Sequence, residues 1–192
     1  EIPSYWPRIV GLDFGWNHPT AATWAAWDRD TDTAYIYDSY AMSQESVPIH
    51  ASAIKARGNW IPCIWPMDGR QADKGSGKSL TEQYRVEGVN MTKEHFSNPP
   101  PQGAKEHTGG NSVEAGVQDM LTRFQTNRLK IFANQSKLLE EMRMYHRKDG
   151  KIVPINDDVI SAMRYGILSL RKARVKNYQP TQILSDSEFN VF

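Results

Sequence analysis

Hydrophobic and polar positions follow two different periods along this chain, and together they predict a mixed α/β fold. The first part has the pattern of strands: an apolar run at 9–12, then residues 20–27 and residues 34–40. The polar segment 28–33 is typical of a hairpin loop between the last two strands. We therefore expect three antiparallel strands at the start of the domain.

Helical spacing then alternates with short apolar runs. The expected helices lie at 46–57, 79–87, 111–127, 136–144 and 156–175. The expected further strands lie at 61–68, 89–92 and 129–133, with a hairpin in 145–155 that turns at Asp149-Gly150. A strand, a helix and a strand in succession indicate a parallel crossover. The expected fold class is α/β, a mixed sheet of three antiparallel strands followed by parallel strands, with helices on both faces.

Composition limits the functional classes further. The 192 residues suffice for one sizeable core, and we expect one domain over 1–176 and a polar C-terminal tail over 177–192. A formal net charge of +1 gives no general attraction to nucleic acid. The single cysteine, Cys63, excludes an intrachain disulfide and a cysteine-based zinc site, which favours a reducing compartment. No apolar run has the length of a membrane span, so no membrane is expected as a partner.

Two apolar runs end in an aspartate followed by a glycine. The first is Ile-Val-Gly-Leu-Asp-Phe-Gly, which contains Asp13, and the second is Ile-Pro-Cys-Ile-Trp-Pro-Met-Asp-Gly, which contains Asp68. A carboxylate at the end of a buried strand is costly unless a cation meets it, although an aspartate that begins a turn is the simpler interpretation. Because neighbouring parallel strands end at the same edge of a sheet, we expect Asp13 and Asp68 to lie side by side.

A third acidic position opens the last expected helix, at Asp157 and Asp158. Acids there commonly cap a helix and complement its dipole. On a helical wheel Asp158 lies beside small residues such as Ala162, whereas Asp157 lies beside Arg164 on a more solvated stripe. We therefore expect Asp158 to be the inward group.

Three carboxylates without a cysteine or a suitably spaced histidine pair form a hard-oxygen site, which suits Mg²⁺ or Mn²⁺. Two such ions about 4 Å apart can activate water and stabilise the leaving oxygen in phosphodiester cleavage. The predicted mechanism has Asp13 bridging the two ions, Asp68 holding one, and Asp158 or Asp157 holding the other.

The two aspartate-ending runs, together with Asn-Asp-Asp-Val-Ile-Ser-Ala-Met-Arg-Tyr-Gly at 156–166, resemble the nuclease domain of the large terminase subunit. This subunit is the headful DNA-packaging enzyme of tailed bacteriophages, and its nuclease domain has a ribonuclease H-like fold. The resemblance covers roughly residues 8–172. It implies metal-binding acids at Asp13, Asp68 and the pair Asp157 and Asp158. Many relatives have an acid where this chain has Ser161, so the metal-binding member of the pair stays open.

The resemblance also implies partners. They are double-stranded DNA, an ATPase motor domain in the full-length protein that this sequence lacks, the portal and the small terminase subunit. The implied location is the host cell cytoplasm, at the procapsid. The expected activity is metal-dependent endonucleolytic cleavage of double-stranded DNA with little sequence specificity, during viral genome packaging.

Basic residues near the acids are weak candidates for contacts to DNA phosphates. They are Arg70, Lys74 and Lys78 after Asp68, and Arg143, Arg147, Lys148 and Lys151 around the expected hairpin. Ordinary solvated loops explain them about equally well. The segment Gly75-Ser76-Gly77-Lys78-Ser79 imitates a nucleotide-binding P-loop, but Ala72 stands where that motif requires its first glycine.

Two other functional classes stay open from the sequence. Gly-Leu-Asp-Phe-Gly also resembles the opening phosphate loop of actin-like and sugar-kinase-like nucleotide-binding domains, although those proteins have two lobes and are longer. A non-catalytic interaction domain on the same fold would use the aspartates for turns and caps. Tight ATP binding would favour the first alternative, and an absence of Mn²⁺ binding would favour the second.

Overall fold

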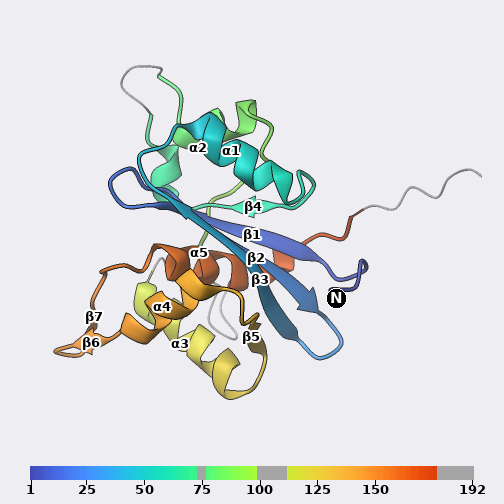
Figure 1. The fold of residues 1–192 in the computed structure, drawn as a ribbon, viewed down its shortest axis with the longest axis vertical. Coiled ribbons are helices and arrows are strands. Elements are labelled where there is room, and N and C mark those ends of the chain that lie inside the picture. The colour runs from blue at the N-terminus through green and yellow to red at the C-terminus, as the bar shows by residue number, and fades with distance from the viewer. Residues whose placement is uncertain (73–76, 99–111, 177–192) are drawn as a thin grey trace, which may run out of the picture.

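A computed structural model describes residues 1–72, 77–98 and 112–176. Its centre is a five-stranded sheet in the order β4-β1-β2-β3-β5, with helices on both faces (Figure 1). The strands are β1 (Arg8–Asp13), β2 (Thr20–Asp28), β3 (Thr33–Met42), β4 (Cys63–Ile64) and β5 (Leu129–Ile131). The helices are α1 (Val47–Ala56), α2 (Leu80–Val86), α3 (Val113–Gln125), α4 (Ser136–Met144) and α5 (Asp158–Ile167).

Strand directions confirm the expected fold class. β1, β2 and β3 pair antiparallel, while β4 pairs parallel with β1 and β5 pairs parallel with β3. Helices α1 and α2 cover one face of the sheet, and α3, α4 and α5 cover the other (Figure 1). The mixed α/β sheet predicted from the order of the segments is therefore the one observed.

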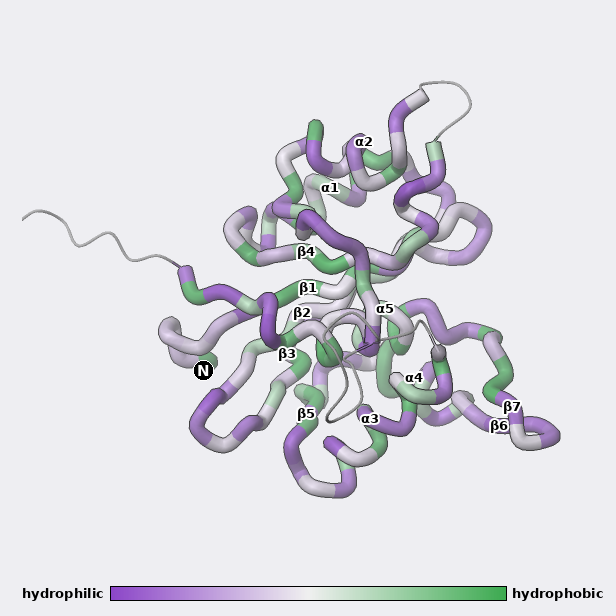
Figure 2. The backbone as a smooth tube through the Cα atoms, turned by 180° about the vertical axis from the view of Figure 1, so that it is seen from behind, coloured by the Kyte–Doolittle hydropathy of each residue, from purple (hydrophilic) through white to green (hydrophobic). Residues whose placement is uncertain are grey.

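Alternation along β1 divides the core into two clusters. Ile9 packs into the cluster on the α5 side, while Val10 and Leu12 pack into the cluster on the α1 side. In the tube view, hydrophobic colour marks β1 and β4 where they run between the two helical layers (Figure 2). A strand that is buried on both faces is hydrophobic at nearly every position, which is why this segment reads as a continuous apolar run.

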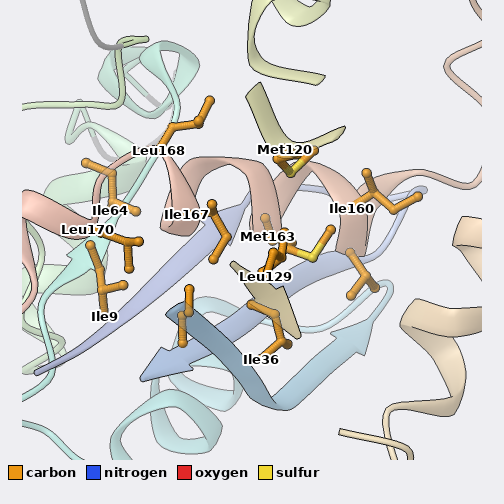
Figure 3. Packing of buried hydrophobic residues seen from close by; sticks show 14 of the residues in the cluster. Ile9, Ile36, Ile64, Met120, Leu129, Ile160, Met163, Ile167, Leu168 and Leu170 are labelled. Atoms are coloured by element: carbon orange, nitrogen blue, oxygen red, sulfur yellow. The ribbon is translucent and has the colours of Figure 1, made fainter. Parts of the chain in front are cut away.

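Helix α5 is the central element of the larger cluster. Its buried residues Met163 and Ile167 pack in one cluster with Ile9 and Ile36 of the sheet (Figure 3). The helix approaches β1 closely because Gly11 has no side chain: a Cβ atom there would overlap the Ala162 carbonyl oxygen and lie 2.7 Å from the Gly166 nitrogen. This close packing places the start of α5 beside the end of β1.

The predicted hairpin forms between α4 and α5. Strands β6 (Arg147–Lys148) and β7 (Lys151–Ile152) pair antiparallel around Asp149 and Gly150. Both turn residues have positive φ, at 51° and 77°, as a two-residue hairpin turn of this sequence requires. The hairpin projects from the body of the domain (Figures 1 and 2).

Three predicted elements differ from the structure. The strand expected at 61–68 is limited to Cys63–Ile64, because Pro62 and Pro66 have no N–H to donate. The strand expected at 89–92 is only a bridge between Met91 and Cys63. The last helix ends at Ile167, not at 175. After a short 3₁₀ turn at Leu170–Lys172, the chain leaves the helix to pair Arg174 with Arg8 at the start of β1.

In the described part of the chain, every helix is too short or too polar to cross a membrane. The tail predicted at 177–192 lies outside the described residues.

Candidate functional site

Four acids lie at one end of the sheet. Asp13 is the last residue of β1, and Asp68 lies in a 3₁₀ turn, Met67–Arg70, that follows β4. Since β1 and β4 are parallel neighbours, both acids leave the sheet at the same edge. Asp158 is the first residue of α5 and Asp157 precedes it as the N-cap. The close packing of α5 on β1 brings this pair to the same place.

The charges of these acids act on one another. The pKa of Asp13 rises from 3.8 to about 7, first because the group is buried and then because Asp68 and Asp158 repel its negative charge. Burial also raises the pKa of Asp68, Asp157 and Asp158. Asp68 is an exposed residue, although its carboxyl group is partly covered. The site thus concentrates negative charge that a cation would stabilise.

Asp158 acts on Asp13 more strongly than Asp157 does, and both residues are half-buried. The simple interpretation of this pair as helix caps does not hold for Asp157, which occupies the N-cap position but makes no side-chain capping hydrogen bond. The carboxylate of Asp157 therefore accepts no capping hydrogen bond from the helix that it precedes.

Among residues 1–72, 77–98 and 112–176, no three side chains of His, Cys, Asp or Glu form a ready group for holding a metal ion. The acids are close enough for their charges to repel one another, but their carboxylates do not converge on one point as the ligands of a bound metal ion would. Mg²⁺ commonly binds to only one or two carboxylates and keeps several of its waters. The all-oxygen donor set and the raised pKa of Asp13 fit such an ion.

Arg164 is part of this site, contrary to the sequence-based expectation of a solvated stripe. The residue is 5% exposed, and its guanidinium lies 4.7 Å from the ring centre of Tyr165 and 5.5 Å from that of Phe96. Gly116 of α3 makes room for it, since a Cβ there would lie 2.9 Å from the Arg164 Cδ. Its positive charge lowers the pKa of Asp13 and of Asp157.

Three further groups that act on the acids or on the helix carrying them were not predicted from the sequence. The charges of His18 and Lys137 lower the pKa of Asp158. Buried Glu141 of α4 accepts hydrogen bonds from the backbone at the start of α5, and burial raises its pKa to about 7. Only the position of Lys137, one helical turn before Glu141, is a local sequence signal; the other contacts depend on the packing of distant elements.

The predicted DNA-contacting cations lie on two segments of the chain. Arg70 and Lys78 are exposed on the segment after Asp68, and Arg143 and Lys148 are exposed at the end of α4 and on the hairpin. These two regions lie on opposite sides of the sheet at the same end of the molecule (Figures 1 and 2). Arg147 is also exposed, and its Nη1 lies 2.6 Å from Oε2 of Glu114. Lys74 lies outside the described residues.

The segment that imitates a P-loop ends in a helix cap. Ser79 is the N-cap of α2, and its hydroxyl accepts a hydrogen bond from the Glu82 N–H at 3.2 Å. The helix predicted at 79–87 therefore has a side-chain cap at its first predicted residue. The Ser79 hydroxyl, which would contact a metal ion in a true P-loop, therefore serves the helix here.

Comparison with known proteins agrees with this arrangement. The chain is 39% identical over 176 residues to the large terminase subunit of Salmonella phage P22, an alignment that covers 91% of this chain and 34% of the relative. It is also 26% identical over 176 residues to the large terminase subunit of Escherichia phage T5, covering 86% of this chain and 36% of the relative. The chain thus spans about a third of the length of these relatives.

Two solved structures share the fold. The nuclease domain of the P22 large terminase superimposes with a TM-score of 0.80 at 39% identity, covering 91% of this chain and 87% of that one. The nuclease domain of the large terminase of bacteriophage SPP1, solved with bound Mn, superimposes with a TM-score of 0.61 at 17% identity, covering 84% and 85%. The sequence model of the terminase RNaseH-like domain family matches residues 10–170, and the chain therefore belongs to this family.

Proposed function

We propose that this domain is a metal-dependent endonuclease that cleaves double-stranded DNA with little sequence specificity during viral genome packaging. The observation that carries the proposal is the gathering of Asp13, Asp68 and Asp158 at one edge of the sheet. Burial there, and then the charges of Asp68 and Asp158, raise the pKa of Asp13 to about 7. The nuclease domain of the bacteriophage SPP1 large terminase, which shares the fold, was solved with bound Mn, and this supports the same ion here. Membership in this family also argues against the alternative of an actin-like or sugar-kinase-like nucleotide-binding domain.

The proposed ligands are Asp13, Asp68 and Asp158, with Asp157 as the alternative to Asp158. Two Mg²⁺ or Mn²⁺ ions held there would supply activation of water and stabilisation of charge for phosphodiester hydrolysis. Asp13 is central to the set, because the charges of the other three acids all act on it. Arg164 offsets part of this negative charge from the buried side.

Arg70, Lys78, Arg143 and Lys148 are proposed to hold the DNA backbone on both sides of the acids. Such contacts bind phosphates without reading sequence, which agrees with low sequence specificity. We propose Arg147 as a weaker contributor, because its charge is shared with Glu114.

The full-length protein is proposed to join this domain to an ATPase motor and to work with the portal and the small terminase subunit at the procapsid, in the host cell cytoplasm. The length of the relatives supports this proposal, since the matched region is about a third of each. A large terminase from a thermophilic bacteriophage, solved in complex with ATP-gamma-S, likewise contains the matched region as 41% of its chain.

The test is cleavage of supercoiled plasmid in Mn²⁺, in Mg²⁺ and in chelator, by the wild-type domain and by Asp13→Asn. We expect cleavage only with metal, and a loss of at least about 100-fold in Asp13→Asn because the central ligand is lost. Asp119→Asn, an exposed aspartate of α3, is the matched control and should cut like the wild type. Cleavage in chelator, or full activity of Asp13→Asn, would contradict the proposal. A domain that binds no Mn²⁺ would favour a non-catalytic interaction domain.

A further inference from the structure

Helix α5 begins without a cap of its own, although it carries the acid pair of the proposed site. The first helical N–H groups have no partner inside a helix and ordinarily bond to the side chain of the N-cap residue. Asp157 occupies that position and makes no such bond. The start of α5 therefore needs an acceptor from elsewhere in the fold.

Glu141 of α4 supplies this acceptor. Its Oε2 accepts hydrogen bonds from the backbone N–H of Val159, at 2.9 Å, and of Ile160, at 3.1 Å. These are the second and third residues of α5, the two positions that an N-cap side chain normally serves. They follow Asp158 directly along the chain. One carboxylate oxygen from another helix thus holds the turn from which Asp158 projects.

The surroundings of Glu141 indicate a role besides stabilising the start of α5. The residue is 1% exposed, and its second oxygen, Oε1, is buried without a hydrogen-bond partner within the described residues. A half-satisfied buried carboxylate is costly compared with a serine or aspartate that caps locally. Capping from a distance has one consequence that local capping lacks, because it leaves the carboxylate of Asp157 available beside Asp158.

From this geometry we propose that Glu141 is a positioning residue of the metal site: it replaces Asp157 as the cap of α5 and thereby orients the Asp157 and Asp158 pair toward Asp13. The inference rests on the proposed function of the site. Residues that orient metal ligands from behind typically affect metal affinity or activity 10- to 100-fold when they are changed.

The test compares substitutions that separate position from charge. Glu141→Gln keeps an oxygen at the same reach and removes the charge, whereas Glu141→Asp keeps the charge and withdraws the oxygen by one methylene group. Glu141→Leu removes the acceptor altogether. Ser112→Ala is the matched control, because Ser112 caps α3 through the Ala115 N–H at 3.4 Å.

Two measurements apply to each variant: Mn²⁺ affinity by calorimetry, and hydrogen exchange at the amides of Val159 and Ile160. We expect Glu141→Gln to bind Mn²⁺ nearly as the wild type does, and Glu141→Asp and Glu141→Leu to bind on the order of 10- to 100-fold more weakly. Exchange at the two amides should accelerate in the weak binders only. Ser112→Ala should change neither quantity. If Glu141→Leu does not fold, Glu141→Gln and Glu141→Asp still decide the outcome.

The opposite ranking, with Glu141→Asp normal and Glu141→Gln impaired, would show that charge rather than position matters and would overturn the inference. Equal Mn²⁺ affinity in all variants would overturn it as well. In both cases the wild-type domain still binds Mn²⁺ and the proposed function stands. A wild-type domain that binds no Mn²⁺ refutes the proposed function itself, so the two failures are distinguishable.

Discussion

Asp13 shows at the scale of one residue how the candidate site conflicts with stability. Its carboxyl group is driven toward the protonated form by burial and by the charges of Asp68 and Asp158. Arg164 relieves this conflict only in part, since the pKa of Asp13 still reaches about 7. An ionised Asp13, buried beside other acids at neutral pH, destabilises the domain unless a bound metal cation offsets its charge.

This conflict predicts how stability depends on pH in chelator. Because the folded pKa of Asp13, about 7, exceeds the unfolded value of 3.8, the folded state binds more protons between these pH values. The free energy of unfolding should therefore fall as the pH rises from 4 to 7. Asp13→Asn should be more stable than the wild type by about 2–4 kcal/mol at pH 8, and equal to it near pH 4. Urea denaturation at several pH values measures the difference.

Asp119→Asn provides the reference. The carboxylate of Asp119 is exposed, so this substitution should leave the pH dependence of the free energy of unfolding unchanged. In Asp13→Asn the free energy of unfolding should still fall with rising pH, but less steeply, since Glu141 also has a pKa raised to about 7. Mn²⁺ at pH 8 should stabilise the wild type and not Asp13→Asn, by mass action on the folded state. A variant less stable than the wild type at pH 8 would contradict this account.

At the scale of elements, the site depends on the contact between β1 and α5. Gly11 lets the helix backbone approach the strand, and the acid at the end of β1 therefore lies close enough to the acid at the start of α5 for their charges to interact. The small residues Ala21 and Ala25 of β2 lie in the same cluster as Ala162 of α5. The apolar pattern of each element is visible in the sequence, but the closeness of the two backbones follows only from their packing.

Gly11→Ala should separate the two elements. The added Cβ overlaps backbone atoms of Ala162, which cannot move aside as a flexible side chain can. We expect a loss of about 3 kcal/mol in the free energy of unfolding and weaker Mn²⁺ binding, because α5 and Asp158 shift away from Asp13. Denaturant titration and calorimetry measure the two effects.

Gly166→Ala is the matched control on the facing helix. Its Cβ would lie 3.4 Å from the Gly11 nitrogen and 3.7 Å from the Gly11 Cα, distances that need little or no adjustment, and alanine favours helix. It should change stability by less than about 1 kcal/mol. Equal effects of the two substitutions would refute the role assigned to close packing at Gly11.

At the scale of the whole molecule, charge is unevenly placed although the total is small. The formal net charge is +1, yet exposed cations are grouped on the segment after Asp68 and on the end of α4 with the following hairpin. Figure 1 shows the hairpin projecting from the body of the domain. DNA binding should therefore depend on this local arrangement rather than on an overall attraction, and should weaken steeply with salt.

Lys148→Ala tests the contribution of the hairpin. If Lys148 contacts a phosphate, its loss should weaken binding equally for all DNA sequences and reduce the slope of log affinity against log salt by about 1. Lys130→Ala, an exposed lysine of edge strand β5, should leave the slope unchanged. Fluorescence anisotropy with two unrelated duplexes in chelator measures both. An unchanged slope in Lys148→Ala would exclude this hairpin contact.

Element order and strand directions were predictable from the sequence, because periodicity and turn residues act over a few neighbours. The turn at Asp149 and Gly150 and the cap at Ser79 are local in this sense. The end of the last helix was not predictable in this way, since Arg174 pairs with Arg8 across almost the whole chain.

The sequence by itself therefore determined the mixed sheet, the family and the candidate acids. Only the tertiary structure decided which groups surround those acids. The burial of Arg164 depends on a glycine in another helix, and the capping of α5 depends on Glu141 from α4. The physical reason is that local pattern encodes which face of an element is apolar, whereas charge compensation depends on neighbours that packing brings together from distant parts of the chain.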